Sequence, residues 1–378
     1  MSNSLVPVRR NRASTPVPQL SGLMSTPGDR VQAFQQQAIS DSTRRNYQRD
    51  WLVFEAWCTS RGRDFLPAEP RTVAEYVAEH ANLVDETGRW FYAPGTIETW
   101  VAAINKAHEA ARLSKPGSHS DVTLTMAGIR RAHSRPKARK APLLLPDLST
   151  AIRAIDLRTW PNAVIGYRDW AMMLFGFVGA YRRSEVASLL LVDVRPHSED
   201  GLHITLRSSK TDQEAEGMVK GLPFGANPWT CAPCAFHRWT QVLVASDKPR
   251  ATRMRQVYEA AKTLDTHVCR TPSPTLPSSV NHDHLFRPVM KNAAIKDRAL
   301  NGQAVNDTVH RRLAAIGVYP TLYGAHSLRA GFVTQAFRAG ATHHEVMRQT
   351  GHKSVGTVEE YSRESAPLLH NAVSKLNL

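Results

Sequence analysis

The chain has 378 residues, and its 48 Lys and Arg against 33 Asp and Glu give a formal net charge of +15. A hydrophobic share of 42% excludes a largely disordered chain, and the length suits two domains and a tail. The longest apolar run, Trp170 to Tyr181, is too short to cross a membrane, so no membrane partner is expected. With only four cysteines and no signal-peptide pattern, we expect a reduced, cytoplasmic protein. The charge favours nucleic acid as the partner, although other soluble basic proteins share this composition.

The first part of the chain is predicted to be an arm followed by a helical domain. Residues 1–37 are rich in Pro, Ser and Gln and lack a sustained apolar period, which is typical of a mobile arm. Ser42 is the predicted N-cap of the first helix, because Tyr47, Trp51, Phe54 and Cys58 then recur at helical spacing. Amphipathic segments at 72–80, 96–112 and 122–131 complete a predicted bundle of four helices over residues 38–138.

Basic residues crowd the segment between the two predicted domains. From Arg130 to Lys140 the chain is rich in Arg and Lys and has no large apolar residue, which indicates a basic linker ending at residues 139–145. It is either a solvated loop or a segment that crosses a DNA backbone. For the basic residues on the predicted helices of the first domain, surface solvation explains each one as well as DNA contact does. The candidate DNA-binding residues are Arg44, Arg45, Arg49, Lys106, Arg135 and Arg139.

The remainder of the chain, residues 146–378, is predicted to be a second domain, mostly α with a small β-hairpin or sheet. Apolar spacing predicts a long buried helix over about 167–189. Alternating segments at 202–207 and 218–222 flank a polar, turn-prone stretch and predict the hairpin. Residues 245–282 are interpreted as a partly irregular insertion, and the chain from residue 302 onward as helical.

Four motifs in this second domain carry residues suited to DNA strand transfer. They are Gly179-Ala-Tyr-Arg-Arg-Ser-Glu185, Arg207-Ser-Ser-Lys-Thr211, Gly324-Ala-His-Ser-Leu-Arg-Ala-Gly331, and Gly351-His352 with Tyr361 nine residues later. Each residue alone has a structural explanation, such as a core tyrosine, a helix-ending histidine or a solvated lysine. In this order and spacing they resemble the tyrosine recombinases, also called phage-type integrases.

The resemblance implies a two-domain, C-shaped DNA clamp. A helical, SAM-like core-binding domain at 38–138 would precede a catalytic domain with a C-terminal helix. The short arm favours a Cre-like or Xer-like arrangement over the lambda type. The implied catalytic residues are Arg182, Lys210, His326, Arg329, His352 and Tyr361, with Glu185 supporting Arg182.

The residue types suit this chemistry without a cofactor. A tyrosine can attack the scissile phosphate and form a 3′-phosphotyrosyl bond, which stores the phosphodiester energy for religation. Two arginines can clamp the non-bridging oxygens with paired hydrogen bonds. Lys210 would protonate the leaving 5′ oxygen, and His326 would orient the phosphate or help move the tyrosine proton. His352 would be a further hydrogen-bond donor to the phosphate.

The resemblance also implies the partners. Double-stranded DNA sites would be exchanged through a Holliday junction by a homo-tetramer, for integration, excision or resolution. Apolar spacing over 368–376 predicts a tail helix that docks either on a neighbouring protomer or on its own domain. Two rivals stay open: a type IB topoisomerase or telomere resolvase, which a plasmid-relaxation assay would distinguish, and a DNA-binding regulator with a decayed active site.

A metal site is considered at Cys231-Ala-Pro-Cys234 with His237. One C-x-x-C and one histidine lack a convincing fourth ligand, although Cys269 or His282 is a candidate. The group His282, Asp283 and His284 is equally weak. Packing is therefore favoured at both places, and no metal is predicted.

Overall fold

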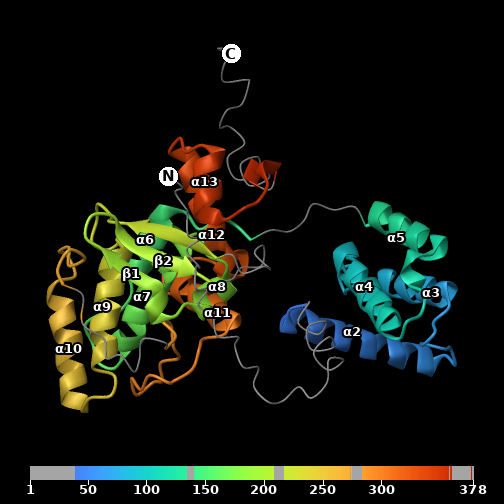
Figure 1. The fold of residues 1–378 in the computed structure, drawn as a ribbon, viewed down its shortest axis with the longest axis horizontal. Helices are drawn as coiled ribbons and strands as arrows, with labels where there is room; N and C mark the ends of the chain where they lie inside the picture. The colour runs from blue at the N-terminus through green and yellow to red at the C-terminus, as the bar shows by residue number, and fades with distance from the viewer. Residues whose placement is uncertain are drawn as a thin grey trace, which may run out of the picture. The chain divides into compact units, whose positions relative to one another are not determined.

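The computed structural model describes residues 39–133, 140–207, 217–272, 274, 283–356, 358–359 and 376. The chain divides into two compact units, Met1–Lys137 and Ala138–Leu378 (Figure 1). This division falls within the basic segment interpreted as a linker. The predicted arm at 1–37 and the tail helix lie outside the described residues, apart from Leu376.

The described part of the first unit is helical. Its elements are α2 (Asp41–Ser60), α3 (Pro70–Ala81), α4 (Pro94–Ala110), the 3-10 turn η1 (Pro116–Ser118) and α5 (Ser120–Ala132). The N-cap of α2 is Ser40, whose side chain accepts a hydrogen bond from the Thr43 N–H. The prediction of Ser42 as the cap is therefore wrong by two residues. Phe54, Tyr76 and Ile97 are fully buried and form the centre of a core rich in aromatic rings.

The second unit holds most of the chain's helices. They are α6 (Leu145–Arg153), α7 (Asn162–Val178), α8 (Arg183–Ser188), α9 (Ala232–Val244), α10 (Arg250–Lys262), α11 (Gly302–Ala314), α12 (Ala325–Arg338) and α13 (His343–Thr350), with 3-10 turns η2 (Leu191–Asp193) and η4 (Pro320–Leu322). The predicted single helix over 167–189 is wrong, because the chain breaks between α7 and α8. Helix α10 lies in the segment that the sequence indicated to be partly irregular.

Three strands form one antiparallel sheet in the described part of this unit. They are β1 (Val194–His197), β2 (Gly201–Leu206) and β3 (Met218–Pro223), in the order β1-β2-β3. Strands β2 and β3 are the predicted hairpin, with Leu206 opposite Met218. Strand β1 was not predicted, because Pro196 argues against a strand and is tolerated only at an edge such as this. The predicted fold class, mostly helical with a small sheet, is confirmed.

Close backbone packing positions α12 beside the buried helix α7. At Gly176 of α7, an added Cβ would lie 2.7 Å from Leu328 Cδ1 of α12. On another side of α12, Leu143 donates its N–H to the Ser327 carbonyl at 2.9 Å, and a Cβ at Gly331 would lie 1.8 Å from the Leu143 oxygen. The contact of α12 with the Leu143 backbone thus requires glycine at position 331.

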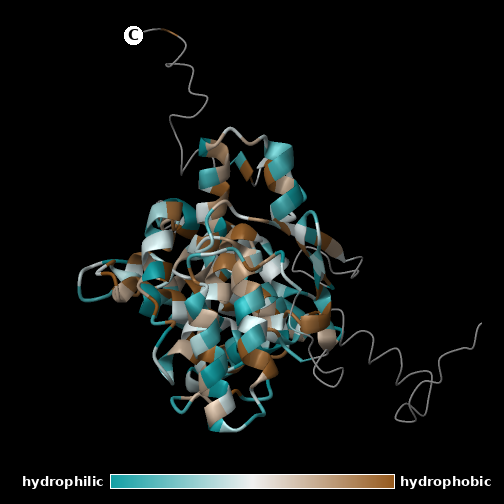
Figure 2. Cartoon of the chain, turned by 90° about the vertical axis from the view of Figure 1, so that its left-hand side faces the viewer, coloured by the Kyte–Doolittle hydropathy of each residue, from teal (hydrophilic) through white to brown (hydrophobic). Residues whose placement is uncertain are grey.

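The surface helices of the second unit are amphipathic. Figure 2 shows hydrophilic and hydrophobic stretches alternating along them, as expected where one face packs inward and the other meets water. Among the described residues, no helix has the length and apolar character needed to cross a membrane.

Candidate active site

Arg182 lies at the break between α7 and α8. Helix α7 ends at Val178, and Ala180 then adopts a φ of +47°, a left-handed conformation that costs about 1 kcal/mol for a residue with a Cβ. Arg182 is the N-cap of α8. Its backbone N–H donates to Glu185 Oε2 at 2.8 Å, and its Nη1 donates to Glu185 Oε1 at 2.7 Å. The buried Glu185 carboxylate thus fixes both the backbone and the guanidinium of Arg182.

Arg329 lies on the second turn of α12. It is 1% exposed, and its Nη1 donates to the carbonyl of Ala180 at 2.6 Å. The left-handed residue at the α7–α8 break therefore presents its carbonyl to a catalytic candidate. Nη2 of Arg329 donates to His352 Nε2 at 2.7 Å. His326 lies one turn earlier on α12 and is exposed.

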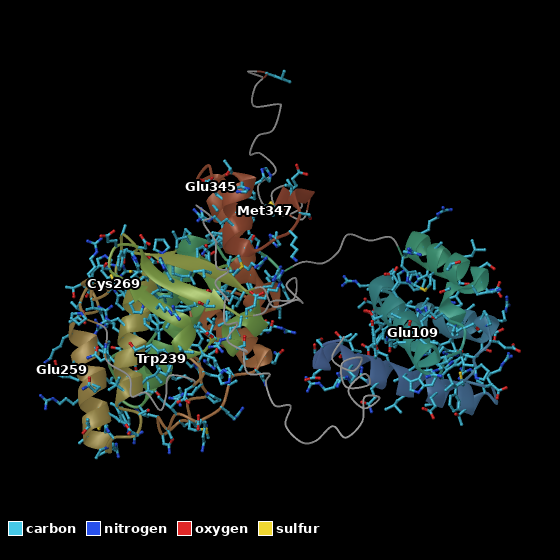
Figure 3. The ribbon with its side chains drawn as sticks, in the orientation of Figure 1. Glu109, Trp239, Glu259, Cys269, Glu345 and Met347 are labelled. Carbon is cyan, nitrogen blue, oxygen red and sulfur yellow. The ribbon has the colours of Figure 1, made fainter. Side chains whose placement is uncertain are left out.

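His352 follows Gly351, the C-cap residue of α13. Thr342 and Glu345 form a capping box at the start of this helix, and Gly351 ends it with a φ of +72° (Figure 3). Because a guanidinium can only donate, Nε2 of His352 accepts from Arg329 and the proton is assigned to Nδ1. Nδ1 then donates to Thr350 Oγ1 at 2.9 Å. The ring is thereby held on both sides.

The pKa of His352 reports the charge around it. Burial and the positive charges of Arg329, Arg182, Lys220 and His326 lower this pKa from 6.5 to about 3. His352 is therefore neutral at neutral pH. Cations from the α7–α8 break, the sheet and α12 therefore act together on His352.

Lys220 is a candidate that the sequence analysis missed. It is 1% exposed on β3, donates from Nζ to the Gly179 carbonyl at 2.9 Å, and lies 4.4 Å from the centre of the Tyr181 ring. Burial lowers its pKa from 10.5 to about 7; Glu185 opposes the shift, and Arg329 and Arg182 add to it. The sequence did contain one signal for the burial of Lys220. Residues two apart on a strand share a face of the sheet, so Lys220 lies on the same face of β3 as the apolar, buried Leu222.

Two of the predicted catalytic residues, Lys210 and Tyr361, lie outside the described residues, but their neighbours in sequence are placed. Met218, at the base of the hairpin that carries Lys210, has its Sδ 3.1 Å from where a Cβ of Gly351 would stand. Val358, three residues before Tyr361, is fully buried in a cluster with Val333, Phe337 and Val346. Both flanking segments therefore pack on the elements that hold Arg329 and His352.

The candidate DNA-binding residues are distributed over the surface of the first unit where the structure describes them. Arg44, Arg45, Arg49 and Lys106 are exposed on α2 and α4. Three of them have acidic neighbours: Arg44 with Asp41 at 3.4 Å, Arg49 with Asp50 at 2.8 Å and Lys106 with Glu109 at 2.7 Å. Arg135 and Arg139 lie outside the described residues.

Comparison with known proteins gives relatives along nearly the whole chain. No family model matches it. The chain is 27% identical over 340 residues to an integrase/recombinase xerD homolog of Selenomonas ruminantium, covering 89% of this chain and 86% of the relative. It is 23% identical over 378 residues to recombinase cre of Escherichia phage P1, covering 96% and 95%.

A solved structure supports the fold. The Tn1549 transposon integrase in complex with transposon right end DNA matches with a TM-score of 0.51 and 13% identity, covering 89% of this chain and 95% of that one. At this identity the match supports the fold alone. The recombinase relatives and this shared fold agree with the order of the motifs in the sequence. Along nearly its whole length, the chain is similar in sequence to known recombinases.

Proposed function

We propose that this chain is a site-specific DNA recombinase that cuts and rejoins strands through a 3′-phosphotyrosyl intermediate on Tyr361. The observation that carries the proposal is the convergence of Arg182, Arg329 and His352, which come from three separate segments. Burial of His352, together with the positive charges of Arg329 and Arg182 beside it, holds the pKa of its imidazole near 3. Such a concentration of cationic donors suits one phosphate group.

The scissile phosphate would replace contacts that the site makes within itself. Arg329 Nη2 now donates to His352, and a non-bridging phosphate oxygen would take over this hydrogen bond. Negative charge from the phosphate would raise the pKa of His352, because it offsets the surrounding cations. The ring could then carry a proton on Nε2 and donate it in a hydrogen bond to the phosphate.

Transfer of the strand requires a nucleophile and an acid. The phenolic oxygen of Tyr361 would bond to phosphorus as the bond to the 5′ oxygen breaks, and Lys210 would supply the proton for that oxygen. His326 would help take the tyrosine proton. Three residues span at most ~11 Å, so the buried Val358 keeps Tyr361 within reach of α12 and α13.

The proposal also covers how the chain binds DNA and how protomers assemble on it. We expect the helical unit and the catalytic unit to close on duplex DNA as a C-shaped clamp. Four protomers on two sites would exchange strands in pairs through a Holliday junction in the cytoplasm of a bacterial cell. The C-terminal segment at 368–376 would dock on a neighbouring protomer; a truncation after Ser365 that leaves assembly intact would instead favour docking in cis.

A nicked suicide duplex tests the proposal. Duplexes bound by the full chain are selected from a random pool, and the selected site is rebuilt with a nick beside the scissile phosphate. Wild type should give an SDS-resistant DNA adduct, and Tyr361→Phe should bind the duplex equally well but give none. Tyr319→Phe is the matched control, because Tyr319 is exposed in the same unit and should leave the adduct unchanged. An adduct from Tyr361→Phe, or none from wild type, would contradict the proposal.

A further inference from the structure

Four metal-binding side chains meet at the start of α9, away from the residues assigned to catalysis. Cys231 is the N-cap of α9 and Cys234 lies in its first turn, while His267 and Cys269 come from the segment after α10. One ligand atom from each of the four lies within 4.8 Å of the others. Cys231 and Cys234 are fully buried. Figure 3 labels Cys269 on this segment and Trp239 further along α9.

The distances match those around a tetrahedral zinc ion. Zinc bonds of about 2.3 Å to sulfur and 2.0 Å to nitrogen separate two sulfurs by about 3.8 Å and a sulfur from a nitrogen by about 3.5 Å. Sγ of Cys231 and Sγ of Cys269 are 3.8 Å apart. Nδ1 of His267 is 3.3 Å from Cys234 Sγ and 3.8 Å from Cys269 Sγ.

Neighbouring backbone groups orient these ligands. Nε2 of His267 lies 3.3 Å from the Ala226 carbonyl, so its N–H can donate there and leave the Nδ1 lone pair facing the sulfurs. The N–H of Gly225 donates to Cys231 Sγ at 3.3 Å. A histidine held by a carbonyl on its outer nitrogen is the usual arrangement of a metal ligand.

We propose that Cys231, Cys234, His267 and Cys269 bind a zinc ion as a structural Cys3His site. Four protein ligands complete a tetrahedral shell and leave no position for a reacting water, so the site stabilises the fold rather than reacts. The ion would join the segment after α10 to the start of α9. The buried Arg238 of α9 already donates to the Thr266 carbonyl of that segment at 2.9 Å.

This proposal replaces the metal-free expectation from the sequence and gives the 245–282 insertion a role. His237, the histidine nearest to the C-x-x-C, instead contacts the Pro272 carbonyl at 3.1 Å and Thr271 Oγ1 at 3.2 Å. The missing ligand is His267, which lies 33 residues after Cys234. No short motif connects such distant positions, and only the fold brings them together.

Metal content tests the site directly. The full chain is purified without an affinity tag or chelator, and zinc is measured by mass spectrometry. Wild type should hold about one zinc per chain, and Cys234→Ser and His267→Asn should lose most of it. His237→Asn and His203→Asn are controls and should retain it. The first control removes a neighbouring histidine on α9. The second breaks the group of His197, Asp200 and His203, in which His203 is half-buried.

Cobalt substitution keeps the test valid if a variant fails to fold. Zinc-stripped wild type titrated with Co²⁺ should develop the visible bands of a tetrahedral site and a near-ultraviolet thiolate band, and zinc should remove both. The proposal is overturned if wild type binds neither metal, or if Cys234→Ser keeps its zinc. It is also overturned if freshly purified protein contains a Cys231–Cys269 disulfide in place of the metal.

Discussion

Glu185 fixes the position of the Arg182 guanidinium, because the two carboxylate oxygens of Glu185 accept hydrogen bonds from the backbone N–H and the side chain of Arg182. Glu185→Gln keeps the side chain's shape but removes the charge. Loss of a charge-assisted bond of about 1.5–3 kcal/mol predicts a strand cleavage rate lower by about 10- to 100-fold, with DNA binding nearly unchanged. Single-turnover cleavage of the nicked duplex measures this. The exposed Glu199→Gln is the control, and equal rates for Glu185→Gln and wild type would contradict the assignment.

Lys220 should make the stability of the protein depend on pH above neutrality. Its folded-state pKa, about 7, lies below the ordinary 10.5, so between these values the unfolded chain binds more protons than the folded one. The free energy of unfolding should therefore rise with pH across this window, by at most about 1.4 kcal/mol per unit. Below pH 7 the cost of burying the charged amine is fully present.

Lys220→Met isolates this contribution. The free energy of unfolding of both proteins is measured by urea unfolding at pH 7 and pH 9.5. From the lower to the higher pH, the value for wild type should rise relative to the value for Lys220→Met. The absolute difference at one pH is less informative, because the variant also loses the hydrogen bond to Gly179. A difference that stays constant with pH would mean that Lys220 does not titrate in this range.

Helix α12 packs tightly against the segment before α6 at Gly331. A substitution of Gly331 therefore tests directly where α12 lies. A Cβ there would overlap the carbonyl oxygen of Leu143, which is backbone and cannot rotate away. Gly331→Ala should reduce the free energy of unfolding by about 1–3 kcal/mol or more. It should also slow cleavage, because α12 carries His326 and Arg329.

Gly128→Ala is the matched control for that substitution. Gly128 lies on α5 with no atom within 4 Å of its added Cβ, so alanine should stabilise the helix by up to about 1 kcal/mol. Thermal or urea unfolding distinguishes the two variants. Similar effects in both would mean that Leu143 does not pack against α12 as described.

The sequence predicted most elements but not the breaks between them. Helical and strand periods located the bundle helices and the hairpin of β2 and β3. The break after α7 depends on Ala180 in a left-handed conformation, which no propensity favours and which the Arg329 contact stabilises. Strand β1 was missed because its Pro196 and exposed side chains have no strand pattern of their own.

Only those residues of the candidate site that belong to short sequence motifs could be predicted from the sequence. Arg182, Glu185, Arg329 and His352 stand in short motifs, and the structure brings them together. Lys220 and His267 belong to no motif, and their surroundings are made by segments distant in sequence. The catalytic roles of all these residues stay predictions, and Lys210 and Tyr361 lie outside the described residues.

At the scale of the whole molecule, the net charge of +15 predicts DNA binding that weakens steeply with salt. Arg45 is exposed on α2, and if it binds a phosphate, Arg45→Ala should reduce the slope of log K against log salt by about 1. Binding isotherms on the selected duplex at several salt concentrations measure this slope. Arg250→Ala on α10 removes the same charge from the other unit and should leave the slope unchanged.

If strand transfer proceeds as proposed, one tyrosine of the chain becomes covalently bonded to DNA. Trypsin digestion of the adduct on the nicked duplex should release residues 354–363, in which Tyr361 is the only tyrosine. Mass spectrometry should find the nucleotide remnant on that peptide. A remnant on residues 313–329, which contain Tyr319 and Tyr323, would contradict the account, as would the absence of any covalent adduct.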